Sequence, residues 1–63
     1  MESDAQRLLR EIKYSQKAYQ NGEAAFEVWF AWRKSIMTEA KILGVTKELL
    51  ELVRKEAIAD GTI

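Results

Sequence analysis

The chain has 63 residues with no cysteine and no histidine, and its ten basic residues balance ten acidic ones. This length makes one small helical domain, residues 1–63, that buries only about 60 % of the surface exposed by its unfolded chain, so its stability is marginal without a partner. The composition excludes disulfides, thiolate metal sites and a histidine general base, and a net charge of zero lacks the basic surplus of most nucleic-acid binders.

Three glycines and no proline divide the chain into three segments, each long enough for a helix. The first helix is predicted over residues 4–20, because Ser3 is a good N-cap and Gln6 can complete a capping box. Gly22 follows its end. The inner face is interrupted by Ser15 and carries Ala5, Leu8, Leu9, Ile12 and Tyr19.

The second segment, residues 23–43, is predicted to form one long helix. Its apolar arc consists of Phe26, Trp29, Phe30, Ile36, Met37, Ala40 and Leu43, with Trp32 at the edge. Arg33 projects into this arc, where an unpaired guanidinium would be costly. Arg33 either pairs with a carboxylate such as Glu11 or extends its charge past the core to solvent. Alternatively, the helix breaks near Ser35 or Thr38; we favour the unbroken helix.

The third helix is predicted over residues 46–60, with Thr46 as its N-cap. Glu48 lies in the first turn, and Val45 and Leu50 stand in hydrophobic-staple positions. The inner face consists of Leu49, Leu50, Val53 and Ala57, flanked by Leu52. The expected fold class is all-α, a three-helix domain (helices about 4–20, 23–43 and 46–60) that self-associates.

We expect no catalytic activity, no cofactor and no metal. Glu48 and Glu51 are neighbours on one helical surface, and we interpret them as a solvated face rather than a catalytic pair. Three short helices leave little room for a concave pocket, and the chain has no glycine-rich phosphate loop.

The turn between the second and third helices has the residue pattern of a helix-turn-helix. Ala40 is small enough for a helix crossing, Gly44 turns the chain, and Val45, Leu50 and Val53 seat the next helix. This pattern resembles the helix-turn-helix of excisionase-like and other small regulators, which implies DNA binding by the third helix.

In the DNA-binding alternative, Thr46, Lys47 and Arg54 contact DNA. A basic ridge on the first helix would hold phosphates through Arg7, Arg10, Lys13 and Lys17. Glu48 and Glu51 oppose this reading because phosphate repels carboxylates. We interpret the ridge as an ordinary solvated face.

A second resemblance covers less than a third of the chain, from Met37 to Leu50. The stretch reads Met-Thr-Glu-Ala-Lys and then, after two apolar residues, Gly-Val-Thr-Lys-Glu. It resembles the helical-hairpin module of SinI-type antirepressors and the matching dimerisation segment of their repressor. The resemblance implies two interlocking helices that capture a repressor by replacing its own dimer contact. Arg33 and Leu49 depart from the family pattern, which has tryptophan and glutamate there.

The second segment carries more apolar surface than its short neighbours can easily cover, and Val28, Leu52 and Ile58 also lie outside the main faces. We interpret Phe26 and Trp29 chiefly as core. Aromatic residues and methionine are favoured at interface centres. The predicted partner contacts are Trp29, Phe30, Trp32, Met37, Leu49, Leu52 and Val53, with Arg33 as an orienting charge.

The sequence therefore predicts a small, non-catalytic, cytoplasmic protein that binds and inhibits or modulates another protein, such as a transcriptional regulator. An antirepressor-like regulator is the sharpest version, and the size also suits a phage or mobile-element accessory protein. The alternative is a helix-turn-helix DNA-binding regulator. No apolar run approaches the roughly 20 residues of a membrane span, and the acidic, polar N-terminal residues do not resemble a signal peptide.

Overall fold

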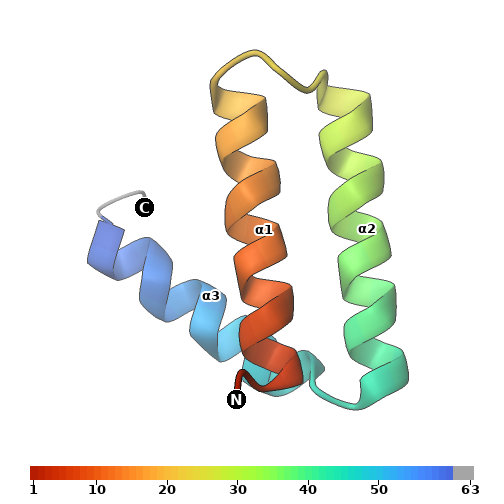
Figure 1. Cartoon of the computed structure of the whole chain (residues 1–63), viewed down its shortest axis with the longest axis vertical. Helices are drawn as coiled ribbons and strands as arrows, with labels where there is room; N and C mark the ends of the chain where they lie inside the picture. Colours follow the sequence, from red (N-terminus) through yellow and green to blue (C-terminus); the bar gives the residue numbers. More distant parts are fainter. Residues whose placement is uncertain (61–63) are drawn as a thin grey trace.

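The computed structural model describes the backbone of residues 1–60 and the side chains of residues 1–56. Three helices follow one another: α1 (Asp4–Gln20), α2 (Phe26–Leu43) and α3 (Thr46–Asp60). α1 and α2 form an antiparallel hairpin, and α3 packs against its lower end, mainly on α1 (Figure 1). The predicted all-α, three-helix fold is confirmed. Within the described residues, no helix combines the length and apolar character needed to cross a bilayer.

α1 begins with the predicted capping box. The Ser3 hydroxyl accepts a hydrogen bond from the Gln6 amide at 3.2 Å, and the Gln6 side chain accepts one from the Ser3 amide at 3.3 Å. Two amides of the first turn, which have no partner within the helix, are thereby satisfied. The N-terminus of α1 is therefore determined by residues only three positions apart.

α2 begins at Phe26, later than the predicted residue 23, because the preceding residues close the end of α1. Gly22 adopts a left-handed φ of +77°, and the Glu23 amide donates to the Ala18 carbonyl at 2.8 Å. This bond belongs to the Schellman arrangement that terminates helices at glycine. Ala25 is extended and serves as the N-cap of α2 without a side-chain hydrogen bond.

From Phe26, α2 continues without a break to Leu43, as favoured from the sequence. Thr38, one of the two possible break points, donates its hydroxyl to the Lys34 carbonyl at 2.9 Å. This back-bonding satisfies the hydroxyl within the helix rather than at a new N-terminus.

The α2–α3 turn uses glycine in the same way, since Gly44 has φ +72° and the Val45 amide donates to the Ala40 carbonyl at 2.9 Å. The Leu49 amide donates to the Val45 carbonyl at 2.8 Å, which gives Val45 the N-cap position. The prediction of Thr46 as N-cap is therefore wrong by one residue: Thr46 is the first residue of α3.

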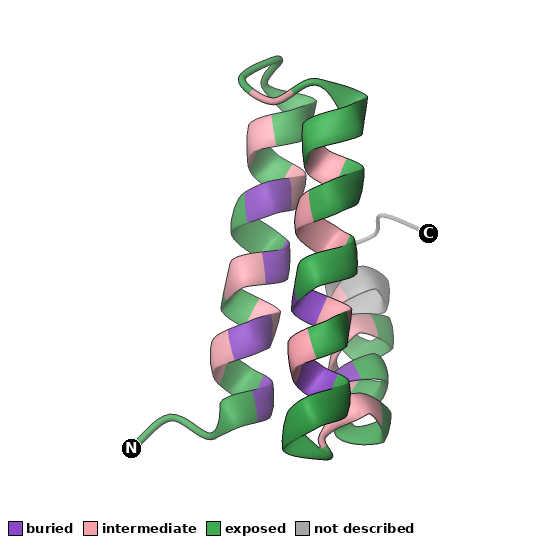
Figure 2. Ribbon diagram, turned by 90° about the vertical axis from the view of Figure 1, so that its right-hand side faces the viewer, coloured by how far each residue is buried: buried purple, intermediate pink, exposed green. Residues whose placement is uncertain are grey.

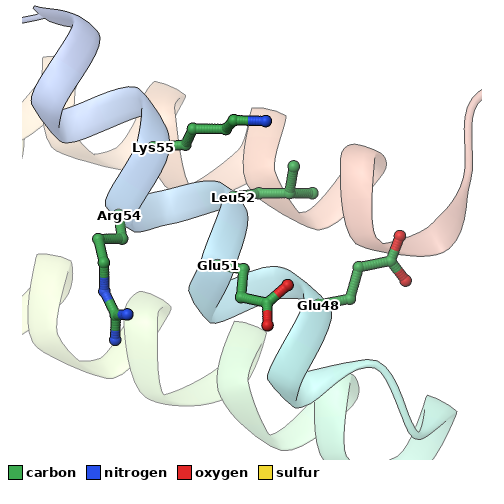
Figure 3. A pocket seen from close by; sticks show the side chains of 5 residues that line it. All are labelled: Glu48, Glu51, Leu52, Arg54 and Lys55. Carbon is green, nitrogen blue, oxygen red and sulfur yellow. The ribbon is translucent and has the colours of Figure 1, made fainter.

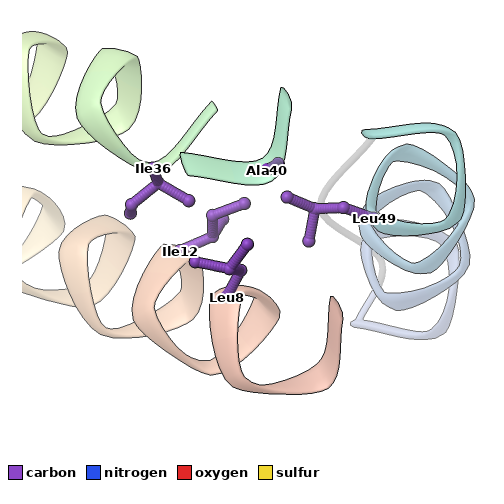
Figure 4. Close-up of a cluster of buried hydrophobic side chains, with 5 residues drawn as sticks. All are labelled: Leu8, Ile12, Ile36, Ala40 and Leu49. Carbon is purple, nitrogen blue, oxygen red and sulfur yellow. The ribbon is translucent and has the colours of Figure 1, made fainter. Parts of the chain in front are cut away.

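The hydrophobic core lies where all three helices meet, and its side chains point toward one another (Figure 4). Leu8 and Ile12 come from α1, Ile36 and Ala40 from α2, and Leu49 from α3, each at most 5 % exposed. The predicted inner positions Ala57 and Ile58 lie outside the residues whose side chains are described.

Ser15, which interrupts the inner face of α1, is fully buried. Its hydroxyl donates to the Ile12 carbonyl at 2.8 Å, so the polar group is satisfied by its own helix. A polar residue is tolerated at this buried position because its hydroxyl needs no hydrogen-bond partner from α2 or α3.

The core is confined to one part of the hairpin. In both views, α3 runs beside the lower half of α1 and α2 and leaves their upper half uncovered (Figures 1 and 2). Trp32, Met37 and Val53 pack partly buried against the core cluster. The N-terminal half of α2 therefore has α1 as its single helical neighbour among the described residues.

Candidate protein-binding site

Aromatic side chains hold the upper end of the hairpin together. Tyr19 of α1 stacks on Trp29 of α2, with ring centroids 5.1 Å apart. Phe26 lies 5.7 Å from Trp29 and 5.9 Å from Phe30. Tyr19 covers one side of this cluster. The other side, which carries Phe30, faces solvent.

An open groove of about 460 Å³ runs along this solvent-facing side of α2. We call it the α2 groove; its lining residues are Phe26, Trp29, Phe30, Arg33, Lys34 and Met37. All six belong to α2, so among the side chains that the structure describes none from α1 or α3 walls it. Phe26 is 55 % exposed and Phe30 is 53 % exposed. The groove therefore offers aromatic surface beside two positive charges, with no carboxylate in its lining.

Arg33 is positioned by an aromatic ring rather than by a carboxylate. Its guanidinium carbon lies 5.5 Å from the Trp29 ring centroid, within the range of a cation–π interaction. Glu11, named as a possible carboxylate partner, instead bonds to Arg7 at 3.2 Å, so the alternative in which it pairs with Arg33 is wrong. Within the described residues, the Nε–H of Arg33 and the indole N–H of Trp29 have no hydrogen-bond acceptor. Arg33 thus extends its charge to the groove wall along the indole.

The structure brings together four of the predicted partner contacts in the α2 groove: Trp29, Phe30, Arg33 and Met37. Leu49 was also predicted as a contact, but it is fully buried in the core and the prediction is corrected. Trp32 and Val53 pack against the core cluster, and Trp32 also contacts the Tyr14 ring at 5.7 Å. These three residues stabilise the monomer rather than line the groove.

Two residues of the groove were not identified from the sequence. The sequence favours Phe26 as core, yet more than half of its surface is exposed, and Lys34 is not among the predicted contacts. The available signal was helical spacing, because Phe26 precedes Phe30 by four residues and Lys34 follows it by four.

Leu52, the remaining predicted contact, lies on a separate hollow of about 310 Å³ on α3, with Glu48, Glu51, Arg54 and Lys55 (Figure 3). All five side chains come from one helix, along which the two acids precede the two bases. The close-up shows them projecting from the helix rather than converging on one point. Within the described residues, no group of three or more acidic, histidine or cysteine side chains is placed to hold a metal ion.

The basic ridge of α1 is largely neutralised by carboxylates. The ion pairs are Arg7 with Glu11 and Glu39 (3.2 and 2.6 Å), Arg10 with Glu2 (3.1 Å) and Lys13 with Glu56 (3.4 Å). The hydrogen bond to Glu39 raises the pKa of Arg7 above its ordinary value. These pairs weaken the ridge as a phosphate contact, since each carboxylate must be displaced or will repel the phosphate.

The other residues of the DNA-binding alternative lie on α3. Lys47 and Arg54 are exposed and Thr46 is half-buried, while the acidic Glu48 and Glu51 are exposed on the same helix. The surface that would meet DNA therefore mixes both signs of charge.

No protein-family model, curated protein or solved structure matches the chain. A functional assignment therefore rests on its own residues and their arrangement.

Proposed function

We propose that this chain is a small protein-binding module that modulates another protein by docking it in the α2 groove. The observation that carries the proposal is the pair of half-exposed phenylalanines, Phe26 and Phe30, beside the Trp29 ring. Leaving aromatic surface in water is unfavourable by about 25 cal/mol for each Å². Contiguous apolar patches rimmed by polar groups mark interaction sites, and aromatic residues dominate the binding energy there.

The charges of the groove add specificity to this apolar surface. Arg33 and Lys34 favour a partner that presents a carboxylate next to apolar side chains. The guanidinium is also held in place by Trp29, so less side-chain freedom is lost when a partner binds. Arg33 accordingly acts as the orienting charge of the proposed site.

The SinI-type resemblance suggests a transcriptional regulator as the class of partner. The segment from Met37 to Leu50 does contain the end of one helix, a tight turn and the start of another. Leu49, however, packs against Leu8 and Ile12 of α1, so interlocking capture by this hairpin would require α1 to move away. We therefore propose the α2 groove, rather than this hairpin, as the surface that would bind a transcriptional regulator.

Affinity capture from the native host lysate, carried out with and without nuclease, tests the proposal. The informative variants are Phe30→Asp in the groove and Val28→Asp as its matched control. Val28 is similarly exposed, at 56 %, and lies two residues away on α2, so it faces a different direction. We expect the wild type and Val28→Asp to retain a stoichiometric protein that Phe30→Asp loses.

Two results contradict the proposal. Equal capture by both variants would remove the α2 groove from the binding site. Recovery of DNA, with all captured proteins lost after nuclease, would favour the helix-turn-helix alternative.

A further inference from the structure

We propose that a second copy of this chain occupies the α2 groove in the isolated protein, with the two α2 helices antiparallel about a two-fold axis. The inference rests on the proposed function in one respect: it takes the groove as a protein-binding surface. It adds the identity of one occupant and the register in which that occupant binds.

The first argument is the spacing of the groove residues. Phe26, Phe30, Arg33 and Met37 are separated by four, three and four residues, which is the seam of a two-stranded coiled coil. The seam spans 12 residues, or about 18 Å of helix. Trp29 and Lys34 flank it on opposite sides, so the groove is the seam together with its two edges.

The second argument concerns direction. In a parallel pair, Arg33 would lie beside Arg33 of the second copy, and two like charges would be buried together. In an antiparallel pair, Phe26 lies opposite Met37 of the second copy, and Phe30 lies opposite its Arg33. Each guanidinium then meets an aromatic ring, and this contact occurs twice because of the two-fold axis. The antiparallel arrangement therefore gives Arg33, the one charged residue of the seam, an aromatic partner.

The third argument is charge complementarity at the edge of the seam. Glu27 and Lys34 are seven residues apart, so they lie on the same side of the seam. Both are exposed, and within the described residues neither forms an ion pair. Antiparallel pairing in this register places Glu27 beside Lys34 of the second copy, and the two-fold axis generates the same pair again.

The length of the seam limits the affinity. An 18 Å helix contact buries less than the 1,200–2,000 Å² of a standard stable interface, so the dimer is expected to be weak, with a dissociation constant on the order of 100 µM. Sedimentation equilibrium from about 10 µM to about 1 mM covers the transition expected from that constant.

Charge reversal provides the test, because both residues are exposed and their replacement leaves the core intact. Glu27→Lys makes two like-charged pairs, and so does Lys34→Glu; each variant alone should dimerise about tenfold more weakly than the wild type. An equimolar mixture of the two variants restores both attractive pairs and should form a heterodimer. Lys47→Glu, a reversal on α3, is the control and should dimerise like the wild type. Circular dichroism verifies that all variants remain folded.

A wild type that stays monomeric up to 1 mM would overturn the inference, and so would a mixture that associates no better than its components. These failures leave the proposed function intact if lysate capture still depends on Phe30. Capture that is independent of Phe30 would instead remove the proposed function, whatever the oligomeric state.

Discussion

Replacing Leu49 with alanine tests the central packing claim, because Leu49 is the one residue of α3 in the buried cluster among those whose side chains are described. It is 0 % exposed and contacts the core formed by α1 and α2. The substitution removes three carbons at roughly 0.8 kcal/mol each, and the cavity left behind raises the total cost to about 2–5 kcal/mol. A domain of this size has only about 3–5 kcal/mol to lose. We therefore expect Leu49→Ala to lose most of the cooperative fold.

Urea unfolding followed by circular dichroism at 222 nm measures this effect, and the adjacent residue supplies the control. Leu50 is 47 % exposed, so Leu50→Ala should cost less than about 1 kcal/mol. The two variants delete the same atoms and differ only in burial. A loss below about 1 kcal/mol for Leu49→Ala, or equal losses for both variants, would refute the placement of α3 on the hairpin.

Three further substitutions test other parts of the structure. Gly44→Ala should cost about 1–2 kcal/mol in urea unfolding, because φ is +72° and no atom lies within 4 Å of an added Cβ, so the cost is conformational alone. Ser15→Val should overpack a fully buried site and reduce the free energy of unfolding by about 1–3 kcal/mol, which lowers the midpoint of thermal unfolding. Ser15→Ala should change this midpoint little. A double-mutant cycle on Arg7 and Glu39 should show a favourable coupling that weakens as salt is added, since this half-buried pair still contacts solvent and joins α1 to α2.

Much of the helical framework could be read from short-range signals. The capping box of Ser3 and Gln6 and the glycines at positions 22 and 44 act on residues within one turn, so their effects are visible locally. The two errors at helix starts have the same origin. Gly22 needs the following amides to complete the end of α1, which delays the start of α2. At α3, the Val45 carbonyl rather than the Thr46 side chain begins the helix.

The candidate site was only partly predictable. Periodicity placed Phe26, Trp29, Phe30 and Met37 on one apolar arc, but an arc wider than a single helix contact does not reveal which edge is covered. Tyr19 of α1 covers the Trp29 edge, and the Phe30 edge stays open.

Sequence alone determined the helical class, the approximate helix bounds and the excess of aromatic residues on α2, because these depend on local propensity, capping and periodicity. Tertiary structure decided that Leu49 is core and Phe26 is exposed, and that Arg33 lies over Trp29 instead of pairing with Glu11. The physical reason is that α3 reaches only the lower half of the hairpin (Figure 2). Burial depends on which helix lies opposite, and that contact joins residues far apart in the chain.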